Sequence, residues 1–196
     1  MAAVGIALTA VALLAASALD LQLGLPTAIA GTVTAAIVLI RDRNSPWSIV
    51  KGISWSVLPL VAGLFVLVEA LDKAGAIGMI TALLHQAAEF SATWTAWSAG
   101  IIVAIASNLI NNLPTGLIAG SAVQSANTPN HITRAVLIGV DLGPNLSVTG
   151  SLATILWLTA LRREGQTVGV VSFLKLGIVI MPPALLLAIG AALLVP

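Results

Sequence analysis

Two short polar segments, residues 107–116 and 141–151, hold most of the side chains in this sequence that could bind a solute or carry a proton. Asp141 lies deep in an apolar run, where a carboxylate is expected to exchange a proton or bind a cation. The nearby amides and hydroxyls both donate and accept hydrogen bonds, which suits a neutral hydroxylated solute or a coordinated cation. The residues predicted to bind substrate or ion are Asn108, Asn111, Asn112, Thr115, Asn145, Ser147, Thr149 and Ser151.

A structural interpretation of the same side chains stays open. Asp141 could cap a half-helix or accept hydrogen bonds from exposed backbone, with no part in transport. Each asparagine could likewise satisfy the broken backbone beside it, and for any single amide the two interpretations carry equal weight. For the asparagines as a set, the sequence favours a binding function.

Proline and glycine in these segments predict that the backbone is broken there. Each proline lacks an amide hydrogen and clashes with the carbonyl four residues earlier, which leaves that oxygen free. In hydrocarbon, a broken helix survives only where it lines a cavity or is buried against protein. Two such interrupted segments are typical of a secondary-transporter binding site. The predicted backbone breaks are Pro114, Gly116, Gly143, Pro144 and Gly150.

The composition places these segments in a membrane protein. Of the 196 residues, 59% are hydrophobic and only 8% are charged, whereas an ordinary soluble domain has about 25% charged residues. About 20 helical residues cross a bilayer core, so the chain allows at most about six to eight spans. This composition excludes a soluble enzyme, a nucleic-acid binder and a disordered chain. The sequence has no cysteine and no phosphate-binding loop, and we predict no catalytic residue, metal or cofactor.

Residues 1–68 are predicted to form scaffold spans. Two apolar runs, 1–19 and 21–40, are separated only by Asp20, which predicts an antiparallel helical pair. Arg41, Arg43 and Lys51 follow, and by the positive-inside rule this loop is cytoplasmic.

The rest of the chain completes one predicted transmembrane domain over residues 1–196. Residues 69–89 mix charged and apolar side chains, a pattern that indicates an amphipathic helix at the interface. Residues 90–127 predict a re-entrant hairpin, because the apolar run after its polar tip is too short to cross. Residues 135–161 predict a discontinuous transmembrane helix, and 173–195 a last span. The expected fold is an all-α polytopic helical bundle.

Three motifs in this region resemble the arsenical pump membrane protein family, ArsB. They are Ser107 to Gly116, Gly139 to Asn145 and Gly150 to Leu158. The resemblance implies two inverted repeats, each with a re-entrant hairpin and a discontinuous helix, in a protein about twice this length. The chain is similar to the C-terminal repeat of such a transporter. We therefore expect a fragment, or a chain whose other half comes from a partner or a second copy.

The resemblance also implies a function. It is the export of arsenite or antimonite from the cytoplasm across the inner membrane, driven by the proton-motive force, with a cytoplasmic ATPase as an optional partner. Asp141 would exchange the proton while the hairpin tip and residues 143–151 hold the solute. One alternative is a sodium/proton antiporter or organic anion carrier of the same superfamily. Another is a transport-inactive fragment that acts as a membrane assembly subunit.

Overall fold

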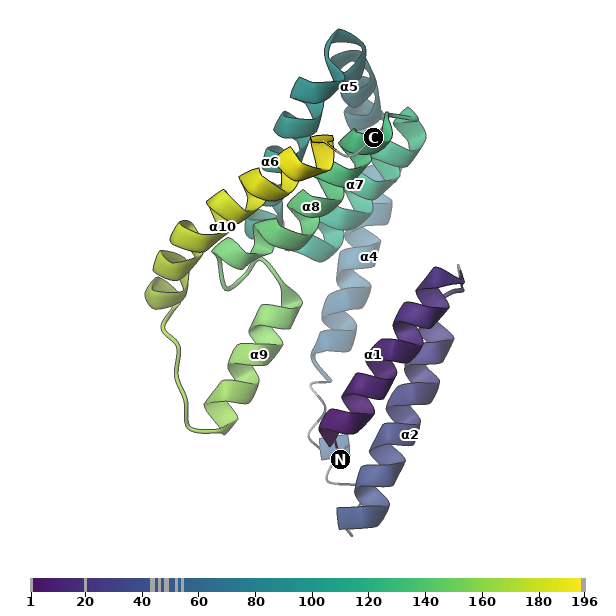
Figure 1. Ribbon diagram of the computed structural model, residues 1–196, viewed down its shortest axis with the longest axis vertical. Helices are drawn as coiled ribbons and strands as arrows, with labels where there is room; N and C mark the ends of the chain where they lie inside the picture. Colours follow the sequence, from purple (N-terminus) through teal and green to yellow (C-terminus); the bar gives the residue numbers. More distant parts are fainter. Residues whose placement is uncertain are drawn as a thin grey trace. The chain divides into compact units, whose positions relative to one another are not determined.

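The structure, a computed structural model, describes residues 2–19, 21–42, 45, 47, 50–51, 53 and 55–194. Asp20 and Arg43, which the sequence analysis singled out, lie outside the described residues. In the part that is described, every regular element is a helix, which confirms the predicted all-α class (Figure 1). Within these described ranges, three helices, α2, α6 and α10, are long and apolar enough to cross a membrane.

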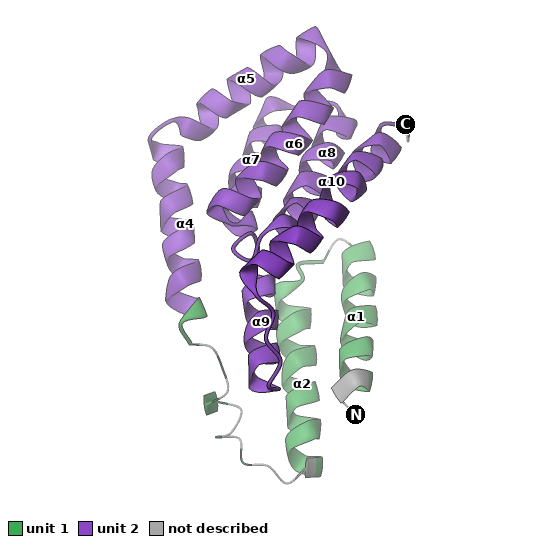
Figure 2. Cartoon of the chain, turned by 90° about the vertical axis from the view of Figure 1, so that its left-hand side faces the viewer, with its two compact units in different colours: residues 1–57 green, residues 58–196 purple. Residues whose placement is uncertain are grey.

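The chain divides into two compact units, residues 1–57 and 58–196, coloured separately in Figure 2. The first unit is built from α1 (Ala2–Ala18) and α2 (Gly24–Asp42), which lie side by side. Gly5 of α1 faces the side chain of Thr34 in α2, so closely that a Cβ there would overlap it. Leu14 and most other large apolar side chains of α1 are exposed, as suits a helix in contact with hydrocarbon.

The second unit contains the two polar segments. Its helices are α4 (Val57–Lys73), α5 (Ala76–Phe90), α6 (Ala92–Ile110), α7 (Asn112–Ala126), α8 (Asn130–Leu142), the 3-10 turn η1 (Gly143–Leu146), α9 (Leu152–Arg163) and α10 (Val170–Leu194). Its main core lies where α6, α8 and α10 meet, and includes Ala96, Ala104, Ile132, Ala135 and Ile189.

Helices α6 and α8 run parallel with their backbones almost in contact. Gly139 of α8 faces the backbone of Gly100, and Gly143 faces Ala104, so both chains advance in the same direction along the contact. Added Cβ atoms at these glycines would overlap the α6 backbone. Small residues therefore allow the close approach, as in many membrane helix pairs.

The segment predicted as a hairpin, 90–127, consists of α6 and α7, separated only by Asn111. Ala99 and Val103 of α6 pack against a cluster that includes Ala119 and Val123 of α7. These positions lie at similar distances before and after Asn111, so the two helices fold back on each other there.

The structure differs from the prediction at residues 69–89. These residues form the end of α4 and most of α5, and so belong to two helices and not to one. The chain turns between them at Gly75, whose φ of 80° is a conformation that favours glycine. An exposed ion pair joins Glu69 to Lys73 at 3.2 Å, and the His85 Nδ1 lies 3.5 Å from a Glu89 carboxylate oxygen. These polar side chains lie on exposed faces of α4 and α5. The break between the two helices was not predicted.

The segment predicted as a discontinuous helix, 135–161, is divided into α8, η1 and α9, with residues 147–151 as a loop. The last predicted span, 173–195, corresponds to α10, which starts three residues earlier, at Val170. This helix continues through Pro182 and Pro183. It contacts α8 and runs antiparallel to α6 and η1: Ile189, near its end, lies against Gly100 in the first half of α6, and Gly177, near its start, lies against the backbone of Asn145 and Leu146 in η1.

Candidate functional site

The two broken segments lie against each other and are joined by hydrogen bonds. The backbone N–H of Asn112 donates to the carbonyl of Gly150 at 2.8 Å. The Asn108 amide donates to the carbonyl of Gly143 at 2.6 Å, and the Asn111 amide to that of Thr149 at 3.1 Å. The tip of the α6–α7 hairpin is therefore tied to η1 and the loop that follows it.

The first break is centred on Asn111. Its φ of 81° and ψ of 150° are rare for a residue other than glycine. The Asn111 side-chain oxygen accepts from the Leu113 N–H at 3.2 Å, so it caps α7 as well as holding Thr149. Thr115 donates its hydroxyl to the Asn111 carbonyl at 2.8 Å. Pro114 lies in the first turn of α7, where a missing N–H leaves no helical hydrogen bond unmade.

The second break follows α8. Pro144 is the second residue of the η1 turn, and the amide of Asn145 donates back to the carbonyls of Asp141 at 3.2 Å and Leu142 at 3.0 Å. Ser151 starts the next helix by accepting the Ala153 N–H at 3.2 Å.

Gly150 is required in this second break by its surroundings. A Cβ at this position would lie 2.7 Å from the Pro144 Cα and 2.9 Å from the Asn108 side-chain oxygen. Gly116 is less confined, since its Cβ would lie 3.1 Å from a methyl group of Val140. Gly150 is therefore required by contacts with the backbone and with Asn108, whereas at Gly116 a small shift of the Val140 side chain would make room for a Cβ.

Some polar groups at the junction lack a strong hydrogen-bond partner. The Asn108 side-chain oxygen and the Ser107 hydroxyl are buried and have no hydrogen-bond partner among the described residues. The hydroxyls of Ser147 and Thr149 lie 3.4 Å apart, and each is 3.5 Å from the Asn108 carbonyl, at the limit of a hydrogen bond. Ser107 is not among the predicted site residues, although a serine next to Asn108 in an apolar helix indicates a buried polar group.

A cavity of about 270 Å³ lies beside this junction. Asn111 and Thr149 are the polar residues of its lining, and Leu60 and Leu64 of α4 contribute to the apolar part. The cavity can therefore hold a small molecule against hydroxyl and amide groups on one side and hydrocarbon on the other.

Asp141 lies outside the group of polar side chains at the junction. It lies in the last turn of α8, its side chain is exposed, and no ion pair to it is present among the described residues. The half-buried side chain of Asn112 likewise makes no hydrogen bond in this part of the chain, while its backbone forms the link to Gly150. No group of three or more His, Cys, Asp or Glu side chains gathers in the described ranges.

Comparison with known proteins gives a consistent result. The family model described as "Arsenical pump membrane protein" matches residues 6–195. The chain is 27% identical over 177 residues to an arsenical pump membrane protein of Yersinia enterocolitica, covering 86% of this chain and 41% of the relative. The corresponding protein of Escherichia coli K12 is 27% identical over 178 residues, with the same coverage. A putative arsenical pump membrane protein of Bacillus subtilis is 24% identical, covering 89% of this chain and 40% of the relative.

The chain thus spans about 41% of the length of these curated relatives, in their C-terminal part. No solved structure matches it.

Proposed function

Because the chain belongs to the arsenical pump membrane protein family, we propose that it forms part of a transporter that exports arsenite or antimonite from the cytoplasm. The chain is that of a multi-pass membrane protein, and the proposed location is the inner membrane. The observation that carries the proposal is the hydrogen-bonded junction of the two broken segments, in which the ArsB-like motifs lie.

The junction divides the predicted site residues into two groups. Asn108 and Asn111 hold the two breaks together through their amide N–H groups, while Thr115, Asn145 and Ser151 satisfy local backbone groups. The groups left for a solute are the hydroxyls of Ser147 and Thr149 and the Asn112 side chain, while the unpaired Asn108 oxygen is buried beneath them. Arsenous acid is a neutral trihydroxy molecule at neutral pH, so hydroxyl and amide groups match its hydrogen-bonding chemistry without a thiolate.

Energy coupling is proposed to depend on Asp141. It lies one turn before Asn145, in the last turn of the helix that enters the second break. A carboxylate near the membrane midplane can take up and release a proton as its access alternates between the two sides. Proton uptake there would change the charge directly beside the solute-binding junction.

The α6–α7 hairpin is proposed to be re-entrant, with Asn111 at membrane depth. The chain turns back at Asn111, where its broken backbone is satisfied by residues 147–151. Such internal satisfaction is what a helix end inside a bilayer requires. A matching inverted repeat, in the remaining length of a longer protein or in a partner, would complete the site.

The proposal is tested by expressing the longest reading frame that contains this chain in cells stripped of their own arsenite exporter. We expect cellular arsenite to stay low, and to rise when a protonophore collapses the proton gradient. Unchanged arsenite accumulation, with the protein detected in the membrane, would contradict the proposal. Sodium-dependent flux or uptake of citrate or succinate would then indicate a different carrier on the same scaffold.

A further inference from the structure

Polar side chains occupy only one part of the cavity at the junction. Of the nine residues that line it, Asn111 and Thr149 are polar, and the other seven are all leucine or isoleucine. The two polar residues are neighbours, because the Asn111 amide donates to the Thr149 carbonyl at 3.1 Å. A solute in this cavity therefore meets hydrogen-bonding groups in one place and hydrocarbon around the rest of its surface.

Helix α4 supplies part of the apolar lining through Leu60 and Leu64. These two residues are four positions apart, so they lie one above the other on the same face of the helix. From Val57 to Val68, α4 contains no polar side chain. The side chains that α4 presents to the cavity therefore cannot form a hydrogen bond with a solute.

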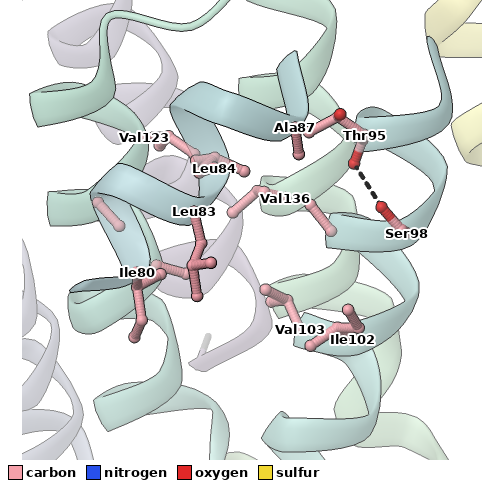
Figure 3. A pocket seen from close by; sticks show the side chains of 13 residues that line it. Ile80, Leu83, Leu84, Ala87, Thr95, Ser98, Ile102, Val103, Val123 and Val136 are labelled. Atoms are coloured by element: carbon pink, nitrogen blue, oxygen red, sulfur yellow. Dashed lines mark hydrogen bonds between the residues drawn. The ribbon is translucent and has the colours of Figure 1, made fainter. Parts of the chain in front are cut away.

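A larger cavity, of about 340 Å³, lies between α5 and the helices α6, α7 and α8 (Figure 3). Its two polar residues, Thr95 and Ser98, donate their hydroxyl hydrogens to helix carbonyls at 2.8 and 3.2 Å. A polar solute would lose hydrogen bonds to water there without replacement. Solute selection is therefore expected at the junction cavity, where polar and apolar side chains share the lining.

From this arrangement we infer that Leu60 and Leu64 determine specificity, by excluding solutes that carry a polar group on every side. The inference rests on the proposed export of arsenous acid. In that molecule the three hydroxyls lie on one side of the arsenic, and the other side holds a lone pair that forms no strong hydrogen bond. The hydroxyls can therefore face the polar part of the cavity while the lone pair faces α4. A tetrahedral acid has a fourth hydroxyl, which would lie against Leu60 or Leu64 and lose its hydrogen bond to water.

Germanic acid provides the test, because it is also neutral at neutral pH and differs by its fourth hydroxyl. Arsenite uptake into everted vesicles that contain the full-length transporter is measured with increasing germanic acid. An added hydroxyl in an apolar site costs up to about 100-fold in specificity, so we expect the inhibition constant of germanic acid to exceed the KM for arsenite by about 10- to 100-fold. Equal values of the two constants would overturn the inference. Vesicles that take up no arsenite would instead contradict the proposed function on which it rests.

A pair of variants on α4 tests the two leucines directly. Leu64→Asn supplies a hydrogen-bond partner at nearly constant size, so the ratio of the germanic acid inhibition constant to the arsenite KM should fall about tenfold. Leu58→Asn is the matched control and should leave this ratio unchanged, since Leu58 is 61% exposed on the same helix and does not line the cavity. The same ratio in both variants would contradict the inference. If Leu64→Asn does not fold, Leu60→Asn makes the same change one turn away, and the wild-type ratio decides independently.

Discussion

Thr149 illustrates how the structure separates binding groups from structural ones. Its carbonyl accepts the Asn111 amide, while its hydroxyl has only contacts of 3.4 and 3.5 Å and lines the cavity at the junction. The backbone of this residue therefore fixes the hairpin tip, and its side chain remains available for a solute.

Replacing that hydroxyl tests the assignment. Thr149→Val keeps the branched shape but removes the hydroxyl, so we expect the KM for arsenite efflux to rise about two- to tenfold, the effect of one lost hydrogen bond. Thr159→Val is the control, because the Thr159 hydroxyl donates within α9 to Ile155 at 2.8 Å. Transport kinetics in everted vesicles measure both variants. An unchanged KM in Thr149→Val would remove this hydroxyl from the site.

Gly150 gives a second prediction at the residue scale. Gly150→Ala places a Cβ against Pro144 and the Asn108 oxygen, so the loop must shift and the hydrogen bond from Asn112 must weaken. We expect a loss of stability of about 1–3 kcal/mol and a loss of transport, both from overpacking. Gly120→Ala in α7 meets open space and should be neutral or stabilising. Thermal unfolding and efflux of the two proteins provide the comparison, and equal behaviour would contradict it.

The residue types in the junction could be predicted from the sequence, but their partners could not. Proline and glycine at 114, 143, 144 and 150 are local signals, and a break is present at both places. The positive φ of Asn111 depends on tertiary packing. So does the hydrogen bond that its amide donates to the Thr149 carbonyl, 38 residues away. The unpaired Ser107 hydroxyl has the same origin, because its burial results from the packing of other helices around it.

At the scale of elements, the parallel contact of α6 and α8 positions the junction. Small residues bring the two backbones together at Gly100 and Gly139, and the same register places Asn108 opposite Gly143. The sequence analysis predicted both helices but not that they pack in parallel. Small residues occur along the whole chain, so their positions do not identify which two helices pack closely.

This contact is also testable. Gly139→Ala adds a Cβ that overlaps the Gly100 carbonyl, so α8 must move away from α6. We expect a lower melting temperature, corresponding to about 1–3 kcal/mol, the usual effect of overpacking in a tight core. Gly63→Ala in α4, where no atom lies within 4 Å of the added Cβ, should show no such loss. A melting temperature unaltered by Gly139→Ala would mean that this close contact does not stabilise the bundle.

At the scale of the whole molecule, the proposed proton coupling requires a path for protons to the junction. Asp141 is exposed on α8 in this chain, and the chain covers about 41% of the length of its relatives. We propose that the remaining part of the transporter faces Asp141 and completes its surroundings, which no pattern within these residues could reveal.

Asp141→Asn removes the titrating group but retains the size of the side chain. In the full-length protein we expect arsenite efflux to become insensitive to a protonophore, or to be lost, because the side chain can no longer exchange a proton. Asp72→Asn, at the exposed end of α4, is the control and should leave coupled efflux intact. Undiminished protonophore-sensitive efflux in Asp141→Asn would assign proton coupling to another residue.

The hydrogen bonds that close the junction also constrain how the protein is made. Their partners are 35 to 41 residues apart, so the carbonyls that Asn108 and Asn111 bind do not yet exist when these two asparagines are synthesised. During insertion the hairpin tip must keep its polar groups in water or against the insertion machinery until α8 and residues 147–151 arrive. The polar junction can therefore close only after residues 143–150 have been synthesised and have left the ribosome, later than the α6–α7 hairpin that it fastens.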